Sequence, residues 1–277
     1  MAHSSLPWSR RVRPTAGVKT AFRDLVWLPA LPLLLFLMLP LLAMFWRAPL
    51  ADLLANLVQP QVWQAISLSL ITTLTTTAVT IVLGTPLAYW LARDNVPFRR
   101  LIDTFIDLPT VLPPAVAGVA LLMAFGRRGI IGDYLDELGI HIAFTQVAVI
   151  MAQMFVAAPL FVKAAILGFQ SIDPELEQAA ALDGASGWQI FSHVTLPLAW
   201  VALLSGSVMT WARALGEFGA TIIFAGNFPG RTQTMPLAIY LGFELDLGLA
   251  LTMSVILMGC SFAVLMLVKY GLHRELS

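Results

Sequence analysis

Six long apolar stretches follow one another along the chain, and shorter polar segments separate them. Each stretch is long enough to cross a bilayer as an α-helix, which needs about 20 residues. The pattern therefore predicts an all-α, polytopic membrane protein whose six transmembrane helices cover residues 26–46, 63–91, 102–125, 146–169, 198–225 and 247–270. A further apolar piece, residues 235–243, is too short to span and indicates a short helix or a re-entrant segment.

The pattern predicts one transmembrane domain, residues 25–270. A polar tail lies on each side of it, residues 1–24 and residues 271–277. Lys and Arg accumulate on the cytoplasmic side of membrane proteins. With six spans, eleven basic residues fall on the side that holds both tails and four fall on the other side. The charge pattern therefore predicts a multi-pass protein with both termini in the cytoplasm.

Two of the stretches have an unusual composition. Six threonines between residues 72 and 80 enrich the second stretch in small hydroxyl residues, which favour close helix packing over a polar path. The third stretch contains LPTVLPPAVAG, in which Pro113 and Pro114 interrupt the helix. A broken helix frees backbone groups that must face protein or a cavity instead of lipid. This segment is therefore either a kinked packing helix or a hinge or pore-lining segment.

The longest polar interruption in the C-terminal half, residues 173–197, predicts two short helices around a turn. Asp173 is a good N-cap, and Pro174 suits the first helical position. Gly184 can end this helix in the left-handed conformation. Ser186 and Gln189 have the spacing of a capping box, which starts a second helix. The pattern fits either a solvated loop or a surface that another protein approaches closely.

Arg213 and Glu217 lie inside the fifth apolar stretch. They are four residues apart, so they share one helix face and can pair. A charge in the middle of a membrane is costly unless it is paired or hydrated. The pair either fixes the packing of helices or lies at a translocation path or its gate, and we favour the second interpretation.

Composition excludes several classes of function. The chain has 277 residues, of which 58% are hydrophobic and 12% charged, so it is not a soluble enzyme domain. It lacks the GxxxxGK[ST] phosphate-binding sequence, so any ATP must bind to another chain. The single cysteine, Cys260, excludes an internal disulfide and indicates a small packing residue. The histidines are scattered and form no metal-binding constellation; they are His3, His141, His193 and His273.

The loop at residues 173–197 resembles the EAA loop of ABC importer permeases. That signature reads Glu-Ala-Ala, three residues, Gly, nine residues, Ile, one residue and Leu-Pro. Its positions are matched here by Gln178, Ala179, Ala180, Gly184, Val194, Leu196 and Pro197. Gln178 replaces the Glu and Val194 the Ile, while Glu177 stands one place earlier. These departures leave open which acidic group serves the loop's polar contact.

Other segments resemble the oxyanion group of these permeases, which import molybdate, tungstate or sulfate. They include LPTVLPPAVAG, GEFGAT and GRTQTMPLAIY, and the resemblance covers roughly residue 63 to the end of the sixth span. The segments are more similar to molybdate permeases than to sulfate permeases. The resemblance implies the type I permease architecture and a location in the bacterial inner membrane.

The resemblance also implies partners. Two copies of this chain would form the pore, two cytoplasmic ATPase subunits would bind ATP and Mg²⁺, and an extracytoplasmic binding protein would deliver the oxyanion. The chain itself would hold no cofactor and would have no catalytic site, and we expect no nucleic-acid partner. Motion of the ATPase dimer would reach the membrane through the loop at residues 173–197.

Three sets of residues follow from this interpretation. Those expected to couple to the ATPase are Glu177, Gln178, Ala179, Ala180, Gly184, Leu196 and Pro197. Those expected at the pathway or gate are Pro113, Pro114, Arg213 and Glu217. Those placed where a binding protein would touch are Arg127, Arg128, Asn227 and Arg231, although a solvated outer loop explains these four equally well.

Three alternatives remain. A sulfate or tungstate permease differs from a molybdate permease only in its cargo. A secondary transporter working without ATP also uses broken helices and buried charges, but it has no use for an ATPase-docking loop. A membrane-embedded enzyme would need paired carboxylates or a metal cluster, and Glu217 has no carboxylate partner within the apolar stretches.

Overall fold

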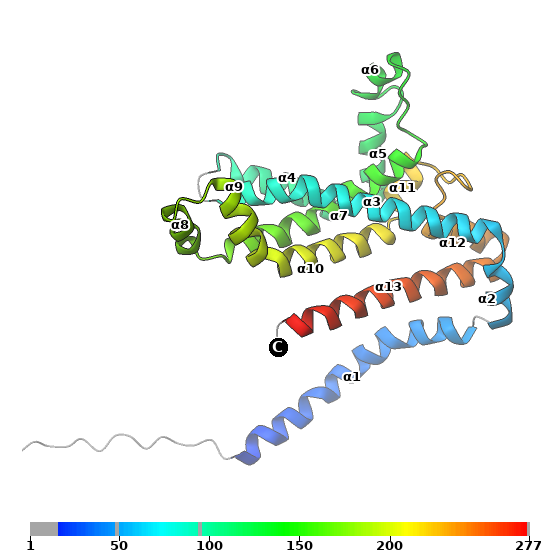
Figure 1. The fold of residues 1–277 in the computed structure, drawn as a ribbon. Coiled ribbons are helices and arrows are strands. Elements are labelled where there is room, and N and C mark those ends of the chain that lie inside the picture. The colour runs from blue at the N-terminus through cyan, green and yellow to red at the C-terminus, as the bar shows by residue number, and fades with distance from the viewer. Residues whose placement is uncertain (1–15, 48–49, 94–95, 276–277) are drawn as a thin grey trace, which may run out of the picture. The chain divides into compact units, whose positions relative to one another are not determined.

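The computed structural model describes residues 16–47, 50–93 and 96–275, and the regular structure within these ranges is entirely helical. The chain divides into two compact units, Met1–Pro49 and Leu50–Ser277. This division falls inside the predicted domain of residues 25–270, and each unit is described by itself. Figure 1 labels the helices.

The first unit contains one helix, α1 (Ala16–Arg47). Its apolar part, Pro29–Arg47, is long enough to cross a membrane. The helix begins inside the predicted tail of residues 1–24, because helical residues precede the apolar stretch by more than two turns. The first 15 residues of that tail lie outside the described residues. Pro29, Pro32 and Pro40 are all inside the helix.

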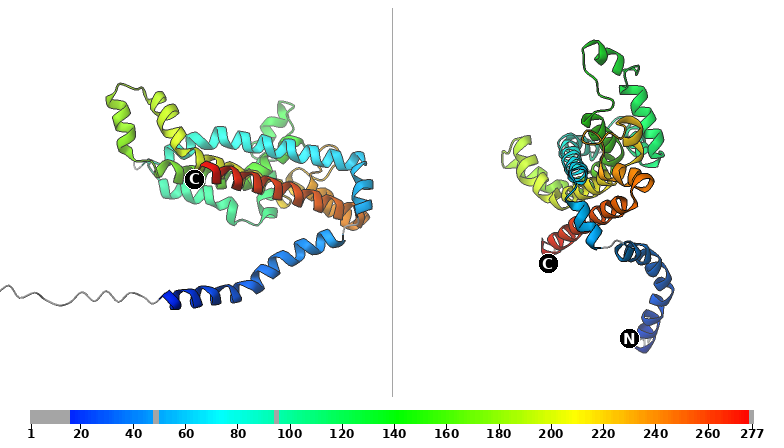
Figure 2. Two further views of the ribbon diagram at one scale, coloured as in Figure 1. Left: turned by 60° about the horizontal axis from the view of Figure 1, so that its bottom comes forward. Right: turned by 90° about the vertical axis from the view of Figure 1, so that its right-hand side faces the viewer.

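The second unit holds the remaining helices. In chain order these are α2 (Leu50–Leu57), α3 (Pro60–Leu91), α4 (Arg99–Val111), α5 (Pro114–Phe125), α6 (Gly132–Glu137), α7 (Gln146–Gln170), α8 (Pro174–Leu182), α9 (Gly187–Ile190), the π-helical turn η1 (Phe191–Thr195), α10 (Leu196–Leu215), α11 (Gly219–Phe224), α12 (Met235–Leu245) and α13 (Leu247–Glu275). In two views, α8 and α9 lie at one end of this unit and α2 and α12 at the other (Figures 1 and 2).

Helices α3, α7 and α10 pack against one another and form the centre of the second unit. Small residues allow close approach of their backbones. A Cβ atom on Gly168 would lie 2.5 Å from Ala202 Cβ, and one on Gly206 would lie 2.8 Å from Ala164 Cβ. Phe161 of α7 is fully buried in the cluster that these helices share. Close backbone packing therefore joins α7 and α10.

Two buried threonines of α3 bond to α7 and favour the packing interpretation, whereas Thr75 is exposed and Thr80 lines a cavity. Thr72, Thr76 and Gln153 are all at most 1% exposed. Thr76 Oγ1 donates to Gln153 Oε1 at 3.1 Å, and Gln153 Nε2 donates to Thr72 Oγ1 at 3.3 Å. Buried polar groups need such partners, and here one amide joins two hydroxyls across the helix interface.

Two predicted spans are broken. Residues 102–125 form α4 and α5, which are bent by 116° at Leu112 and Pro113. The prediction of one helix over residues 198–225 is wrong, because α10 ends at Leu215 and α11 begins at Gly219. Within the described residues, five helices are long and apolar enough to span, or six if the bent pair counts as one span.

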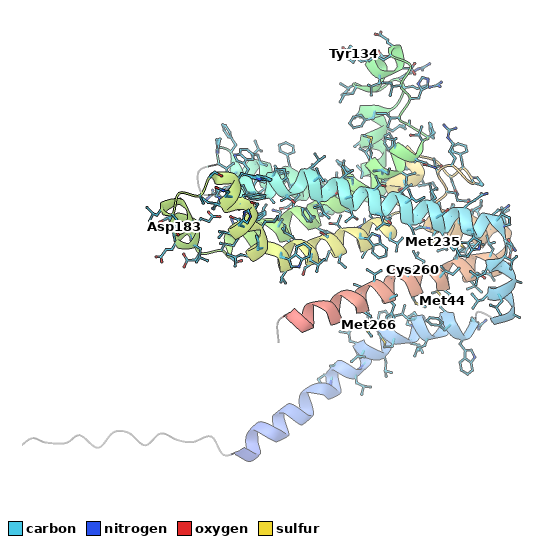
Figure 3. All side chains as sticks on the ribbon, viewed as in Figure 1. Met44, Tyr134, Asp183, Met235, Cys260 and Met266 are labelled. Atoms are coloured by element: carbon cyan, nitrogen blue, oxygen red, sulfur yellow. The ribbon has the colours of Figure 1, made fainter. Side chains whose placement is uncertain are left out.

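The C-terminal helices match most of the predicted pattern. The short apolar piece at residues 235–243 is a helix, α12, and α13 continues past the predicted end of the sixth span at residue 270 to Glu275. Cys260 lies on α13 (Figure 3) and packs against the cluster around Trp211, Leu215 and Met253. It is a packing residue, as predicted.

Candidate coupling loop and transport pathway

Local capping builds the turn between α8 and α9 as the sequence predicts. The backbone N–H of Glu175 donates to Asp173 Oδ1 at 3.0 Å, and Pro174 occupies the first helical position. Gly184 has φ = +89°, the left-handed conformation that ends α8. Ser186 and Gln189 form a complete capping box at the start of α9. These bonds satisfy the free backbone groups at the helix ends.

The α8–α9 loop presents a mixed surface. Gln178, Ala179 and Gly184 are exposed, as a docking role requires, and Pro197 is exposed at the start of α10. The exposed fractions of Leu182 and Trp188 are 89% and 74%. Large apolar side chains on a polar loop are typical of a protein contact, and neither residue was predicted from the sequence. Their apolar character is no specific signal, because Leu176, Ile190 and Phe191 lie in the same segment.

Ala180 and Leu196 are half-buried instead of exposed. Leu196 packs against the hydrophobic cluster that contains Phe161, so it anchors α10 to the core.

Glu177 points into the fold and is bound there. Arg93, just after α3, donates to Glu177 Oε1 at 2.8 Å, and Thr195 Oγ1 donates to the same oxygen at 2.7 Å. These donors lower the pKa of the Glu177 carboxyl, with Arg93 as the largest cause. The hydrogen bond to Glu177 in turn raises the pKa of Arg93. Arg93 is 84 residues away in sequence, so no local pattern reveals the pair.

At the C-terminal end of α10, the predicted pair forms. Arg213 Nη1 lies 2.8 Å from Glu217 Oε2. The second carboxylate oxygen, Oε1, accepts the backbone N–H of Ala220 at 2.8 Å and so caps α11. The Glu217 side chain is 1% exposed, whereas that of Arg213 is 35% exposed. Glu217 is therefore fully engaged, and Arg213, in the last turn of α10, stays partly exposed.

The two broken helices meet at this point. A Cβ atom on Gly219 would lie 2.6 Å from Pro114 Cβ, and one on Gly118 would lie 2.9 Å from the carbonyl oxygen of Ala220. Pro113 precedes α5 and Pro114 is its first residue. The structure thus brings all four predicted pathway residues to two adjoining breaks, and we call this region the paired elbow.

A cavity of about 440 Å³, with both apolar and charged residues in its lining, lies between the α5–α7 connection and the loop after α11. Arg127, His141 and Arg231 are among its lining residues. Asp136 Oδ1 lies 2.6 Å from His141 Nδ1 and 3.8 Å from Arg127 Nε. Tyr134 of α6 lies at a tip that projects from the rest of the second unit (Figure 3). Arg127, Arg231 and Asp136 are the Arg and Asp residues that line the cavity, and Asp133 and Glu137 of α6 are exposed beside it.

The four residues expected to touch a binding protein divide into two groups. Arg127, Arg128 and Arg231 are exposed. Asn227 turns inward, and its Nδ2 donates to the carbonyl oxygen of Leu237 at 3.3 Å. Its observed contact holds the loop to α12.

A second cavity, of about 420 Å³, lies between α3, α7 and the bent α4–α5 pair. Its lining is apolar except for the hydroxyl of Thr80. An anion has no charged partner there, so the paired elbow is the better candidate for a pathway.

Comparison with known proteins agrees with this arrangement. Residues 84–276 match the family model described as the binding-protein-dependent transport system inner membrane component. The chain belongs to this family. The matched region includes the α8–α9 loop and both broken helices, so the resemblance to ABC importer permeases is confirmed.

Similar sequences carry related descriptions. The probable transport system permease protein NifC of Clostridium pasteurianum is 36% identical, over 89% of this chain and 87% of that protein. The molybdenum transport system permease protein ModB of Mycobacterium tuberculosis is 41% identical, over 84% and 88%. The sulfate transport system permease protein CysW of Escherichia coli is 38% identical, over 74% and 72%.

A solved structure supports the fold of this family member. A chain of the bacterial alginate ABC transporter, in complex with a periplasmic protein bound to an alginate pentasaccharide, aligns with a TM-score of 0.70. The alignment covers 93% of this chain and 96% of that chain at 18% identity. The predicted ABC importer architecture is therefore confirmed at the level of fold.

Proposed function

We propose that this chain is the membrane-spanning subunit of an ATP-driven molybdate importer. The observation that carries the proposal is the 41% identity to a molybdenum permease along most of both chains. The sulfate permease is 38% identical over a smaller share of this chain, so sulfate is the second candidate and tungstate a close chemical analogue.

In the proposed assembly, two copies of the chain form the pore and two ATPase subunits bind beneath it in the cytoplasm. The α8–α9 loop docks on the ATPase. Its exposed Gln178, Ala179, Leu182 and Trp188 support this role, because a small-residue face with apolar anchors suits a protein contact. ATP and Mg²⁺ bind to the partner subunit, which supplies the chemistry of hydrolysis. The permease binds and moves the anion.

The paired elbow is the proposed gate. Arg213 holds a partly exposed positive charge near the break after α10, and Glu217 takes up one of its donors while capping α11. The remaining guanidinium donors suit a tetrahedral oxyanion. Each permease copy contributes one elbow, and movement of α11 against α5 opens or closes the path. The neutralising carboxylate keeps the affinity low enough for the anion to leave.

The cavity of about 440 Å³ beside α6 is the proposed receiving surface. Arg127, Arg128 and Arg231 present exposed positive charge that complements acidic side chains of a binding protein. This face then lies outside the cell, while α8, α9 and both termini lie in the cytoplasm of a bacterium. The distribution of basic residues supports that orientation.

The test is ATPase activity of the permease–ATPase complex reconstituted in lipid, with binding protein added empty or loaded with molybdate, tungstate or sulfate. Stimulation by the molybdate-loaded protein supports the proposal. If only the sulfate-loaded binding protein stimulates ATP hydrolysis, the proposed cargo is wrong and the proposed coupling to the ATPase still holds. If no ATPase associates with the chain, the secondary-transporter alternative would be favoured instead.

A further inference from the structure

We infer that Glu177 is a positioning residue that ties the coupling helix α8 to the end of α3, and not a group that contacts the ATPase. The link consists of Glu177, Arg93 and Thr195 and is called the α8 tether below. The inference rests on the proposed function of the α8–α9 loop and specifies how that loop transmits force.

The first observation is that the Glu177 carboxylate is already hydrogen-bonded within this chain. Glu177 Oε1 accepts from both Arg93 Nη2 and Thr195 Oγ1, at 2.8 and 2.7 Å. The Glu177 side chain is only 17% exposed, while its neighbour Gln178 is exposed. Charge-assisted hydrogen bonds of this length are the strong ones. A carboxylate already bound in this way is a poor docking group for a second protein.

The second step is that α8 has few other attachments. No residue of α8 is fully buried, so its packing gives it little hold on the bundle. Its helix neighbours are α9 and η1, which belong to the same loop. Figure 1 shows α8 at the extreme end of the second unit. The α8 tether therefore gives α8 a direct bond to the chain just after a membrane-spanning helix.

The third observation is that the α8 tether contacts residues of other helices through Arg93. The guanidinium of Arg93 lies over the ring of Tyr89, with Cζ 4.5 Å from the ring centroid. Tyr89 makes edge contacts with Phe169 at the end of α7 and Phe191 in η1, at centroid distances of 5.5 and 5.0 Å. A displacement of α8 thus reaches the ends of α3, α7 and α10 through packed side chains.

The π-helical turn places the third member of the tether. A π-turn is rare and is often found at functional sites. Here η1 directs the fully buried Thr195 toward Glu177, and Thr195 is the last residue before α10. The hydroxyl thereby joins α8 to the span that ends at the paired elbow. The same carboxylate oxygen serves two spans, so its loss disconnects both.

The first experiment separates positioning from docking in the full permease–ATPase complex. Glu177→Ala and Arg93→Ala should both copurify with the ATPase at the wild-type ratio, while transport per ATP hydrolysed falls about fivefold. The double variant should be no worse than Glu177→Ala, because that variant already breaks both the Arg93 and the Thr195 bonds. Glu177→Gln, which keeps an acceptor oxygen, should retain intermediate coupling. Glu175→Ala, at an exposed position on the same helix, is the matched control.

Two results overturn the inference. One is loss of ATPase copurification in Glu177→Ala but not in Arg93→Ala, which would make Glu177 a docking group. The other is additive loss in the double variant, which would show that the two residues act separately.

The second experiment uses the permease alone, so it distinguishes failure of the tether from failure of the proposed function. In a Cys260→Ala background, spin labels are placed at Val82→Cys on α3 and Leu182→Cys on α8, both exposed positions. Glu177→Ala should broaden the measured distance distribution and Glu175→Ala should leave it unchanged. An unchanged distribution in Glu177→Ala contradicts the tether. If no ATPase binds the wild-type chain, only the proposed function falls.

Discussion

Glu217 shows how one buried carboxylate can serve two structural purposes. It neutralises Arg213 and caps α11, so both of its oxygens have a partner although its side chain is 1% exposed. The Arg213–Glu217 pair was predictable, because residues four apart on a helix share a face. The cap was not, because it requires the helix to break at Gly216.

Replacing Glu217 with Ala should destabilise the permease by about 3 kcal/mol, because it leaves Arg213 unpaired and the N–H of Ala220 without an acceptor. Thermal unfolding in detergent measures the loss. Glu217→Gln keeps an acceptor for the N–H and should recover part of it. Wild-type melting of Glu217→Ala would show that the pair contributes nothing to the fold.

The Arg93–Glu177 pair predicts a pH dependence at the α8 end. The folded-state pKa of Glu177 is lowered, so its stabilisation is complete above the unfolded carboxyl pKa of about 4.3 and is lost as pH falls through the folded value. The pKa of Arg93 is raised, so its share persists until strongly alkaline pH. Glu177→Gln should therefore melt below wild type at pH 7, and the difference should vanish in strong acid. A difference that persists in acid contradicts this origin.

At the scale of elements, the sequence predicted correctly the features that depend on adjacent residues. It did not predict those that depend on contacts between distant segments. The cap at Asp173, the left-handed Gly184 and the capping box at Ser186 depend on a few adjacent residues, so the sequence contains them in full. The 116° bend between α4 and α5 and the separate helix α11 depend on how two breaks pack against each other. Apolar composition alone does not report such packing.

Gly184 should be needed for its backbone conformation and not for space. A Cβ atom there meets nothing within 4 Å, but φ is +89°. Gly184→Val should therefore strain the turn by about 1–3 kcal/mol and weaken copurification with the ATPase. Gly187→Val is the matched control, since Gly187 also has open space but has no left-handed φ. Equal ATPase binding by both variants argues against a conformational role.

Gly219 should be needed for space. A Cβ atom there would collide with Pro114 Cβ, so Gly219→Ala should push α11 from α5 and cost about 1–3 kcal/mol. Transport and thermal stability should fall together. Gly216→Ala, three residues earlier and with its nearest atom 3.9 Å away, should be tolerated. Normal transport by Gly219→Ala would mean that the paired elbow does not need close contact.

At the scale of the whole molecule, span counting predicted an all-α membrane protein and the EAA spacing predicted its family. The count holds only if the bent α4–α5 pair is one span, because hydropathy measures length and not direction. No sequence pattern predicts the α8 tether, because its two charged members are 84 residues apart. Matches of residue type at fixed spacing therefore revealed the family, while the contacts that connect its parts required the fold.

The proposed orientation predicts which sites a membrane-impermeant thiol reagent reaches. In a Cys260→Ala background, Tyr134→Cys on α6 should react from outside intact cells, whereas Asp183→Cys should react only after the membrane is opened. Tyr134 is exposed, and Asp183 lies at the end of α8 (Figure 3). Labelling of Asp183→Cys in intact cells would place the α8–α9 loop outside and exclude an ATPase contact.

The central claim is that this chain passes molybdate through the membrane at the expense of ATP. The most direct test is uptake of molybdate into proteoliposomes that contain the permease and its ATPase, with loaded binding protein outside and ATP enclosed. We predict accumulation that requires ATP, binding protein and an intact α8–α9 loop. Uptake that proceeds without ATP, or that follows an ion gradient instead, would contradict the account.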